Sequence, residues 1–406
     1  MAVETLEFLI ASVLFKKPRE VPKQTEQTET EHPEHVAENS TAAVKTTKEE
    51  KAEPEIINIT NVSGIDEKRA REIFNEMYAI ARKDFTQDAY QCANERVAKF
   101  EEALMPKMLK VEGALQKFSD PSFQFLITEA HKTAASTERE ADYDLLSELL
   151  LHRVKKDKDR KVRVGIKKAI EIVDQVDDDA LCALTVAYTI ERLFPATGSI
   201  IRGLNILENV FSKLCYTNLC QGKEWLDHLE ILDAVRLDHI SSLKDLDLFY
   251  AEQLDGYVCV GIKKESEDYQ KALSLLSSGN LPRELLCDHE LLEGYVRLPV
   301  INKKQIGSLK LVNKQISSGK LVELPSEISN EQRSILEQIY DLYDKNEEQK
   351  KMVTENFSLE WKKRETLSSL LKWWNDIPMA FDITTVGTVL AHANAQRCDS
   401  SIPPLE

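Results

Sequence analysis

Apolar residues recur at helical spacing over most of the chain, and the longest such pattern begins near residue 63. A helix can start at Ser63 or Asp66, and from there to Phe118 apolar positions alternate at intervals of three and four residues. The spacing predicts one long helix, a rod of about 75 Å at 1.5 Å per residue, which Pro106 should kink or break. The residues of this stripe are Phe74, Met77, Ala81, Phe85, Val97, Phe100, Leu104, Val111, Leu115 and Phe118.

The apolar stripe of such a rod can be buried in two ways. It can pack back on helices of its own chain, or it can pair with another copy. We favour contact with another copy, so the sequence predicts a homo-oligomer.

A run of helices of ordinary length follows the rod. Asp120 is a suitable N-cap with Pro121 at the first helical position. Asp177 and the two aspartates after it precede an apolar helix, where carboxylates favour the positive helix end. The expected helices are 121–137, 140–155, 160–175, 178–194, 199–216, 225–240 and 243–253.

The pattern changes at residues 295–324, where short β-prone runs alternate with polar turns. Tyr295–Val300 and Ser308–Val312 are expected as strands. Further helices are expected at 329–343, 345–355 and 357–375, then a strand at Phe381–Ile383 and a last helix capped by Thr384. The fold is therefore predicted as mainly α: a long N-terminal helix, a helical bundle or short solenoid, and a small α+β C-terminal part.

Residues 1–15 have a pattern of their own. They predict a short amphipathic helix with Glu4 and Glu7 largely off its apolar stripe. So short a helix is marginal in water and should dock on its own domain, a neighbouring copy, a partner protein or a membrane surface. We expect the chain to bind a protein partner through residues 3–15. The expected docking residues are Leu6, Leu9, Ile10, Val13 and Leu14.

The rest of the chain divides into four further segments. Residues 16–57 are rich in Glu, Thr, Lys and Pro and are predicted as a disordered linker, because they cannot bury enough apolar surface to order. Residues 58–215 form the predicted helical domain, 216–294 a helical middle region, and 295–406 a small α+β C-terminal domain.

Composition limits the cellular compartments and the classes of partner that we expect for this protein. The 406 residues carry a net charge of −16, which opposes broad, sequence-independent nucleic-acid binding. The apolar stretch at residues 3–15 is shorter than the about 20 residues of a membrane span, and it lacks the preceding positive charge of a signal peptide. The seven cysteines are scattered without a C-x-x-C pair, which is typical of reduced thiols. We therefore expect a cytoplasmic protein without a transmembrane segment.

No sequence motif of catalysis or cofactor binding is present. The chain has no phosphate-binding loop, no dinucleotide-binding glycine pattern, no G-x-S-x-G and no H-E-x-x-H. His228 and His239 would lie about 16 Å apart along one predicted helix, too far to share one metal ion. Asp288, His289 and Glu290 point different ways on a helix. We expect no cofactor, no metal and no catalytic residue.

One basic segment is a candidate anion site. Residues 295–322 contain six Lys or Arg residues and no acidic residue, so this patch could hold a nucleic acid, a nucleotide or an acidic surface. The alternative is a β-ribbon whose edge is protected by lysines. The mixed-charge run 155–163 reads as a solvated connection rather than a phosphate site. The candidate residues are Arg297, Lys303, Lys304, Lys310, Lys314 and Lys320.

Several stretches resemble a known family. They are Asp120–Phe125, Leu145-Leu146, Leu149-Leu150, Arg153, Asp178–Leu181, Ala183–Thr185, Asp382–Gly387 and Ala391–Asn394. They resemble a family of uncharacterised, mostly helical bacterial proteins known only by locus-tag names, and distantly the helical components of abortive infection. The resemblance covers about residues 58–215 and the last 25 residues. It implies bacterial origin, a cytoplasmic location and a role in stress or phage defence, and it supplies no catalytic residue.

Together these patterns predict a non-enzymatic interaction, sensor or scaffold protein that acts as a homo-oligomer. Two alternatives stay open at this point. One is a nucleic-acid-binding effector that uses residues 295–322, and the other is an enzyme without a recognisable sequence signature.

Overall fold

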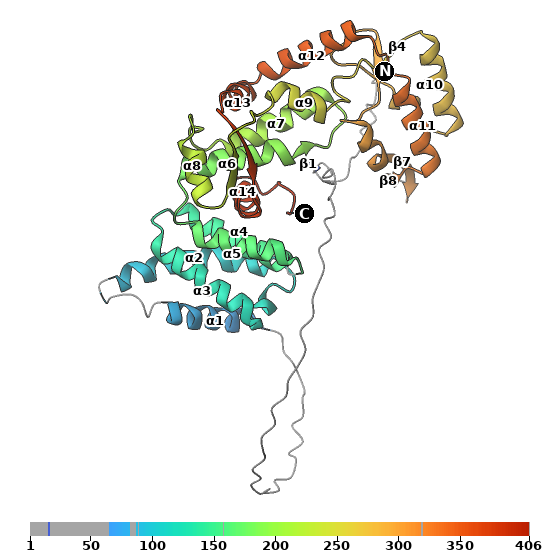
Figure 1. The fold of residues 1–406 in the computed structure, drawn as a ribbon. Coiled ribbons are helices and arrows are strands. Elements are labelled where there is room, and N and C mark those ends of the chain that lie inside the picture. The colour runs from blue at the N-terminus through green and yellow to red at the C-terminus, as the bar shows by residue number, and fades with distance from the viewer. Residues whose placement is uncertain are drawn as a thin grey trace, which may run out of the picture.

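The protein is mainly helical, as the sequence predicts (Figure 1). The computed structural model describes residues 15–16, 65–81, 87, 89–156, 158–317 and 320–405. Except for the strand β1 (Phe15–Lys16), which pairs antiparallel with β2 (Phe194–Pro195), the predicted helix 1–15 and linker 16–57 lie outside the described residues. The predicted docking residues Leu6, Leu9, Ile10, Val13 and Leu14 lie outside them too.

In place of one rod, the first helical stretch is a pair of helices, α1 (Glu67–Ala81) and α2 (Tyr90–Leu109). They run in opposite directions, because the contacts Arg71–Glu101 at 2.6 Å and Tyr78–Asn94 at 2.8 Å join the start of each helix to the later part of the other. The apolar stripe therefore closes within the chain and is buried against the next helix, α3 (Pro121–Ser136). Pro106 lies inside α2, which continues to Leu109.

Local capping decides where the following helices begin. The side chain of Asp120 accepts a hydrogen bond from the backbone N–H of Ser122, and Asp177 does the same for two backbone N–H groups at the start of its helix. Both helix starts confirm the predictions. The helices of this run are α3, α4 (Ala141–Lys155), α5 (Arg160–Ile172), α6 (Asp178–Arg192) and α7 (Ile200–Leu214).

The last helix of the chain packs at the centre of this bundle. α14 (Thr385–Cys398) begins at the predicted cap Thr384, whose hydroxyl accepts from the backbone N–H of Gly387. It lies against α4, α5 and α6, as the red ribbon among the green and teal helices shows (Figure 1). The C-terminal residues therefore complete the core that α1–α7 begin.

The predicted helix 225–240 is wrong in its second half. α8 (Glu224–Ile231) ends early, because Asp233 takes a left-handed φ of 59° and the N–H of Ala234 bonds back to the carbonyl of Leu229. The chain then forms β3 (Val235–Asp238), which pairs antiparallel with β9 (Ala380–Ile383). A partner strand about 145 residues away thus overrides local helix propensity.

A second, smaller apolar core is built by residues between 259 and 343. It combines a three-stranded sheet in the order β4–β6–β5 with α10 (Glu267–Ser278) and α11 (Asn330–Asp341). The strands are β4 (Ile262–Lys263), β5 (Cys287–Asp288) and β6 (Tyr295–Arg297), with the hairpin β7 (Lys310–Ser317) and β8 (Lys320–Glu327) beside them. The helices α9 (Leu246–Gln253), α12 (Glu347–Lys362) and α13 (Glu365–Asn375) contribute to the first core.

Two expectations from composition concern the cysteines and the membrane-spanning helices. All seven cysteines are free of disulfide bonds, and Cys92 is the exposed one. Among the helices that the structure describes, none combines the length and the apolar character that a membrane crossing requires.

Candidate functional site

The predicted basic patch is not one surface, because its first member is internal. Arg297 is completely buried, and its guanidinium lies 3.1 Å from a carboxylate oxygen of Glu290. The same guanidinium donates to the carbonyls of Gly256 and Gly198. Arg297 thus belongs to a structural ion pair with Glu290 and has no exposed face for an external anion.

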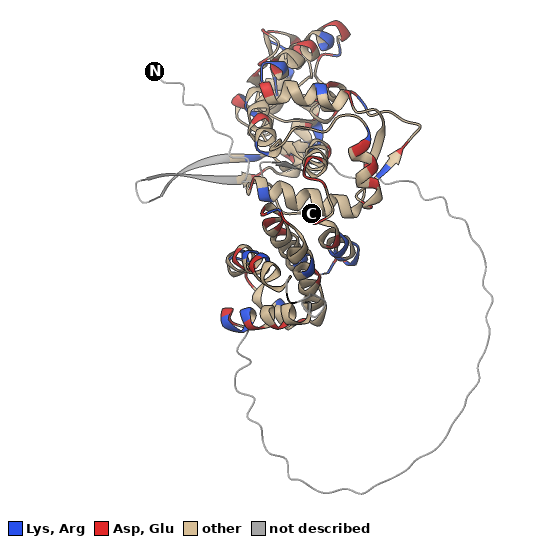
Figure 2. Ribbon diagram, turned by 90° about the vertical axis from the view of Figure 1, so that its left-hand side faces the viewer, with Lys and Arg blue, Asp and Glu red and all other residues tan. Residues whose placement is uncertain are grey.

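The remaining five lysines of that segment belong to the helical turn Lys303–Ser308 and to the hairpin of β7 and β8. Lys303 pairs with Asp341, and Lys304 is exposed. In the β7–β8 ladder, Lys310 stands opposite Glu327, Lys314 opposite Glu323 and Lys320 opposite Ser317. Two of these three register partners are acidic, and both follow residue 322 in the sequence. Figure 2 shows the same mixing of basic and acidic positions along the helices.

The histidines that drew attention in the sequence have structural surroundings. His228 accepts a hydrogen bond from the backbone N–H of Asp177, and His239 lies beyond β3, so the two do not share a helix. His289 is buried, with its Nε2 2.8 Å from the carbonyl oxygen of Cys259. Within the described part of the chain, no group of three or more His, Cys, Asp or Glu residues could hold a metal ion.

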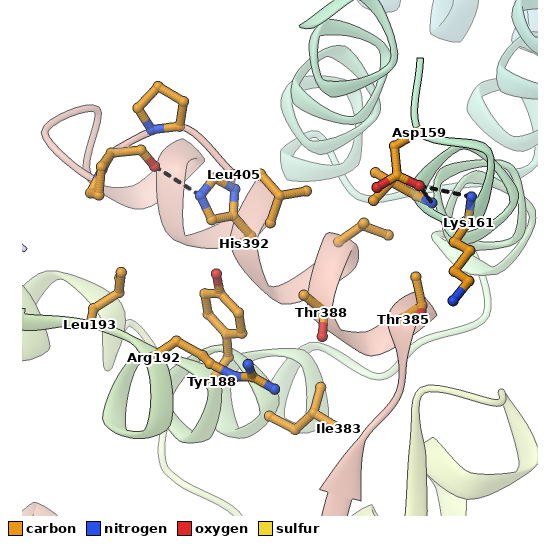
Figure 3. Close-up of a pocket in the computed structure, with 14 residues that line it drawn as sticks. Asp159, Lys161, Tyr188, Arg192, Leu193, Ile383, Thr385, Thr388, His392 and Leu405 are labelled. Atoms are coloured by element: carbon orange, nitrogen blue, oxygen red, sulfur yellow. Dashed lines mark hydrogen bonds between the residues drawn. The ribbon is translucent and has the colours of Figure 1, made fainter. Parts of the chain in front are cut away.

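A partly open cavity lies where the start of α5, the end of α6 and the start of α14 meet (Figure 3). Its volume is about 390 Å³, within the range of small-molecule sites. Its fourth wall is formed by residues 403–405 of the C-terminal tail, which spans residues 399–405. The cavity is lined by Asp159, Lys161, Val162, Tyr188, Arg192, Leu193, Ile383, Thr385, Thr388, Val389, His392 and residues 403–405.

Two cationic side chains enter this cavity from different helices. Lys161 comes from α5 and Arg192 from the last turn of α6, and Figure 3 shows them on opposite sides with Thr385 and Thr388 between them. The apolar part of the lining comes from valine, leucine, isoleucine and proline side chains. The cavity therefore offers two positive charges, one carboxylate and two hydroxyl groups beside an apolar wall. The excess of positive charge suits a small anion with an apolar body.

At one wall of the cavity, His392 and Gln396 hold the C-terminal tail, and His152 contacts both of them. The Nε2 atom of His392 lies 2.9 Å from the carbonyl oxygen of Pro403, and its Nδ1 atom lies 3.2 Å from Nε2 of His152. The side-chain amide of Gln396 donates to the carbonyl of Ile402 at 3.0 Å. Burial lowers the pKa of His152 to about 4 and, together with the neighbouring His152, that of His392 to about 3. Both rings are therefore neutral at pH 7.

These contacts engage the lining groups that could act as general bases. Both ring nitrogens of His392 are engaged within the chain, so the imidazole has no free atom to accept a substrate proton. The carboxylate of Asp159 accepts from the backbone N–H groups of Lys161 and Val162 and serves as the N-cap of α5. The two lining groups that could act as bases are therefore occupied by structural hydrogen bonds.

Sequence reasoning missed this cavity. Its lining comes from residues 159–162, 188–193, 383–392 and 403–405, which are far apart in the chain. Lys161 belonged to the mixed-charge run 155–163, which reads as a solvated connection. Arg192 at the end of an otherwise apolar helix was the local signal, but nothing in the sequence shows what it faces.

Comparison with known proteins identifies a family but no described relative. A family model, whose family is designated only by a locus tag, matches residues 64–402 and so covers more than half of the chain. No curated protein and no solved structure matches the chain.

Proposed function

The chain belongs to this locus-tagged family, and from the chemistry of its cavity we propose that it is a non-enzymatic sensor of a small anionic molecule. The observation that carries the proposal is the convergence of Lys161 and Arg192 on one partly apolar cavity whose lining imidazole is already engaged. A carboxylate between the two cations gains charge-assisted hydrogen bonds, and the hydroxyls of Thr385 and Thr388 add further donors.

The apolar lining indicates what is attached to the anionic group of the ligand. Val162, Ile383, Val389 and Leu405 form hydrocarbon walls beside the polar groups. A short aliphatic chain attached to the anionic group would bury its surface there, at about 25 cal/mol per Å² of apolar area. The ligand class that fits is therefore a small carboxylate with an aliphatic body rather than an inorganic ion alone.

A sensor also needs an element that responds. The tail residues Pro403 and Leu405 line the cavity, while the tail is held by His392 and Gln396. A ligand that contacts the tail together with α5 and α6 binds best when the tail is docked, so its binding stabilises the docked state. A partner protein that binds the surface of the tail could then distinguish the docked tail from the undocked one.

The direct test is ligand binding to the full chain by calorimetry, with hexanoate and octanoate as probes and inorganic phosphate as the bare anion. We expect octanoate to bind more tightly than phosphate, and Arg192→Gln to weaken binding by about tenfold, the loss of one charge-assisted hydrogen bond. Hexylamine, which places a cation on the same chain, should not bind. Arg283→Gln, a substitution of an exposed arginine outside the cavity, is the matched control and should bind like the original chain.

Hydrogen exchange supplies the second readout. Octanoate should slow exchange at the start of α14 and at Ile402, whose N–H bonds to the carbonyl of Asp399. Equal binding of octanoate and hexylamine, or no binding of any probe, would reject the anion site. Binding without a change at Ile402 would reject the sensing role of the tail.

We place this sensor in the bacterial cytoplasm, in stress or phage defence, and as a homo-oligomer that contacts a partner protein. The support for the bacterial defence role is the resemblance of Asp120–Phe125 and related stretches to helical bacterial proteins, together with the family match. The oligomer stays a prediction from the sequence. Light scattering of the purified chain tests the oligomer: a monomer at micromolar concentration would reject it. Deletion of the gene should change the sensitivity of the source bacterium to phage infection, and unchanged sensitivity would reject the defence role.

A further inference from the structure

A second concave surface, separate from the cavity, lies between α3 and α5. This α3–α5 groove has a volume of about 620 Å³ and is lined by five Lys or Arg residues and two Glu residues. Phe125 on α3 is 75% exposed and Val164 on α5 is 54% exposed, so two large apolar side chains stand in water at one basic groove. Single exposed apolar residues are ordinary, but a basic rim around a pair of them indicates a binding surface.

The charges of the groove are only partly satisfied. Lys167 pairs with Glu171 at 3.6 Å, and Lys168 pairs with Asp233 at 3.2 Å. Within the described residues, Arg160 and Arg163 form no ion pair, and the buried Nε–H of Arg163 has no hydrogen-bond acceptor. A buried donor without an acceptor costs free energy, so Arg163 is a reason to expect a carboxylate or carbonyl oxygen at this groove.

The chain itself contains a segment with the complementary chemistry. Residues 3–14 carry two carboxylates, Glu4 and Glu7, and no basic side chain. Their apolar residues follow helical spacing, so a helix of this sequence presents an apolar stripe with the glutamates largely beside it. The stripe matches Phe125 and Val164, and the glutamates match Arg160 and Arg163.

The anchor of that segment and one end of the groove border the same cavity. Residues 15–16 pair with β2 at Phe194–Pro195. Leu193, which immediately precedes β2, lines the same cavity as Asp159 and Lys161 at the start of α5, and Arg160 in that first turn lines the groove. Twelve residues span about 18 Å as a helix and about 40 Å when extended, enough to pass from β2 along the groove.

We infer that residues 3–14 bind in the α3–α5 groove of their own chain, with their apolar residues on Phe125 and Val164 and their glutamates beside Arg160 and Arg163. The groove is thus an internal docking site for an acidic amphipathic segment. It is independent of the anion cavity, since the two sites lie on different faces of α5 and share no lining residue.

Disulfide trapping in the full chain tests the placement. In a Cys92→Ser background, which removes the exposed native thiol, Leu9→Cys is combined with Phe125→Cys and the protein is treated with a mild oxidant. We expect a disulfide between positions 9 and 125 within one chain, identified by peptide mass mapping. The matched control combines Leu9→Cys with Leu359→Cys, because Leu359 is 59% exposed at another concave surface, on α12, and it should give little product.

Charge reversal tests the chemistry. Arg160→Glu with Arg163→Glu should lower the 9–125 yield by about fivefold, the effect of losing two exposed ion pairs. Adding Glu4→Lys with Glu7→Lys should restore the yield, which a general loss of folding would not allow. Equal yields at positions 125 and 359, no product at 125, or failure of the charge swap would overturn the inference. A disulfide that joins two chains would assign the groove to a second copy instead.

Discussion

The guanidinium of Arg297 lies 3.1 Å from the carboxylate of Glu290, although the arginine side chain is completely buried and the glutamate is 27% exposed. The same carboxylate accepts hydrogen bonds from the hydroxyl of Ser199 at 2.7 Å and the backbone N–H of Ile200 at 2.6 Å. One glutamate therefore joins strand β6 of the smaller core to the start of α7 in the larger one. Arg297, which the sequence predicts as an anion ligand on the surface, therefore forms with Glu290 the junction of the two cores.

Removing Glu290 should leave a buried cation without its counter-ion. Glu290→Ala is expected to lower the free energy of unfolding by about 3 kcal/mol, since breaking one side of a buried pair exposes the full desolvation cost of the other. Glu290→Gln keeps an acceptor oxygen for Ile200 and should lose less. Urea denaturation followed by circular dichroism measures both, and a Glu290→Ala protein as stable as the original would contradict the junction role.

Acid should destabilise the protein through its buried histidines. Burial lowers the pKa of His131 to about 3 and that of His289 to about 4, as it does for His152 and His392. The unfolded chain takes up these protons near pH 6.5, while the folded chain does not, so stability is full above pH 6.5 and is lost as the pH falls toward 4.

His131 isolates one part of this effect, because its ring lies among Phe74, Tyr78 and Phe100. His131→Leu should flatten the dependence of unfolding free energy on pH between 6.5 and 4, while leaving stability at pH 7.5 within about 1 kcal/mol. The measurement is urea unfolding across that pH range. An unchanged slope would show that His131 already titrates normally.

A rise in pH from 4.5 to 7 should destabilise the protein through Glu191, the neighbour of the cavity residue Arg192. Burial raises the pKa of the Glu191 carboxyl from 4.5 to about 7, although Arg192 opposes the shift. The folded chain therefore holds a proton that the unfolded chain has released, and stability falls as the pH rises from 4.5 through 7. Glu191→Gln should remove this loss and raise the unfolding free energy at pH 8 by on the order of 2 kcal/mol. The same unfolding experiment at pH 5 and pH 8 checks it, and equal effects at both pH values would refute the assignment.

The start of α14 leaves no room for a side chain at Gly387. A Cβ atom there would lie 2.0 Å from the carbonyl oxygen of Ala234, just before β3. Gly387→Ala should therefore displace α14 from its place in the core and cost about 3 kcal/mol or more. Gly113→Ala is the control: its φ of 74° makes alanine strained, but nothing lies within 4 Å, so about 1 kcal/mol is expected. Thermal unfolding distinguishes the two, and equal melting temperatures would contradict the tight contact.

Local signals in the sequence were sufficient for most helix starts. Asp120, Asp177 and Thr384 each cap the helix that was predicted to begin after them. These starts are visible in the sequence because a cap bonds only to backbone groups two or three residues away. The signal failed at residues 232–240. There an aspartate at positive φ ended α8 without the glycine that usually marks such an end.

Contacts between distant segments could not be read from the sequence. Periodicity showed that the stripe over residues 74–118 must be buried, but both a partner copy and its own helices satisfy that requirement, and the structure buries it within the chain. In the same way, the sequence could not show that Arg297 is buried in the interior, or that Lys310 and Lys314 stand in register with Glu327 and Glu323 of β8.

By itself, the sequence determined that the chain is mainly helical and where its helices begin, because capping and amphipathic periodicity act over a few residues. Only the tertiary structure decided that α14 lies among α4, α5 and α6 and that Lys161, Arg192 and Thr385 face one cavity. The physical reason is that a side chain's charge and shape fix what it can bind, while its neighbours depend on long-range packing, where burial of apolar surface must outweigh the entropy of closing loops of about 200 residues.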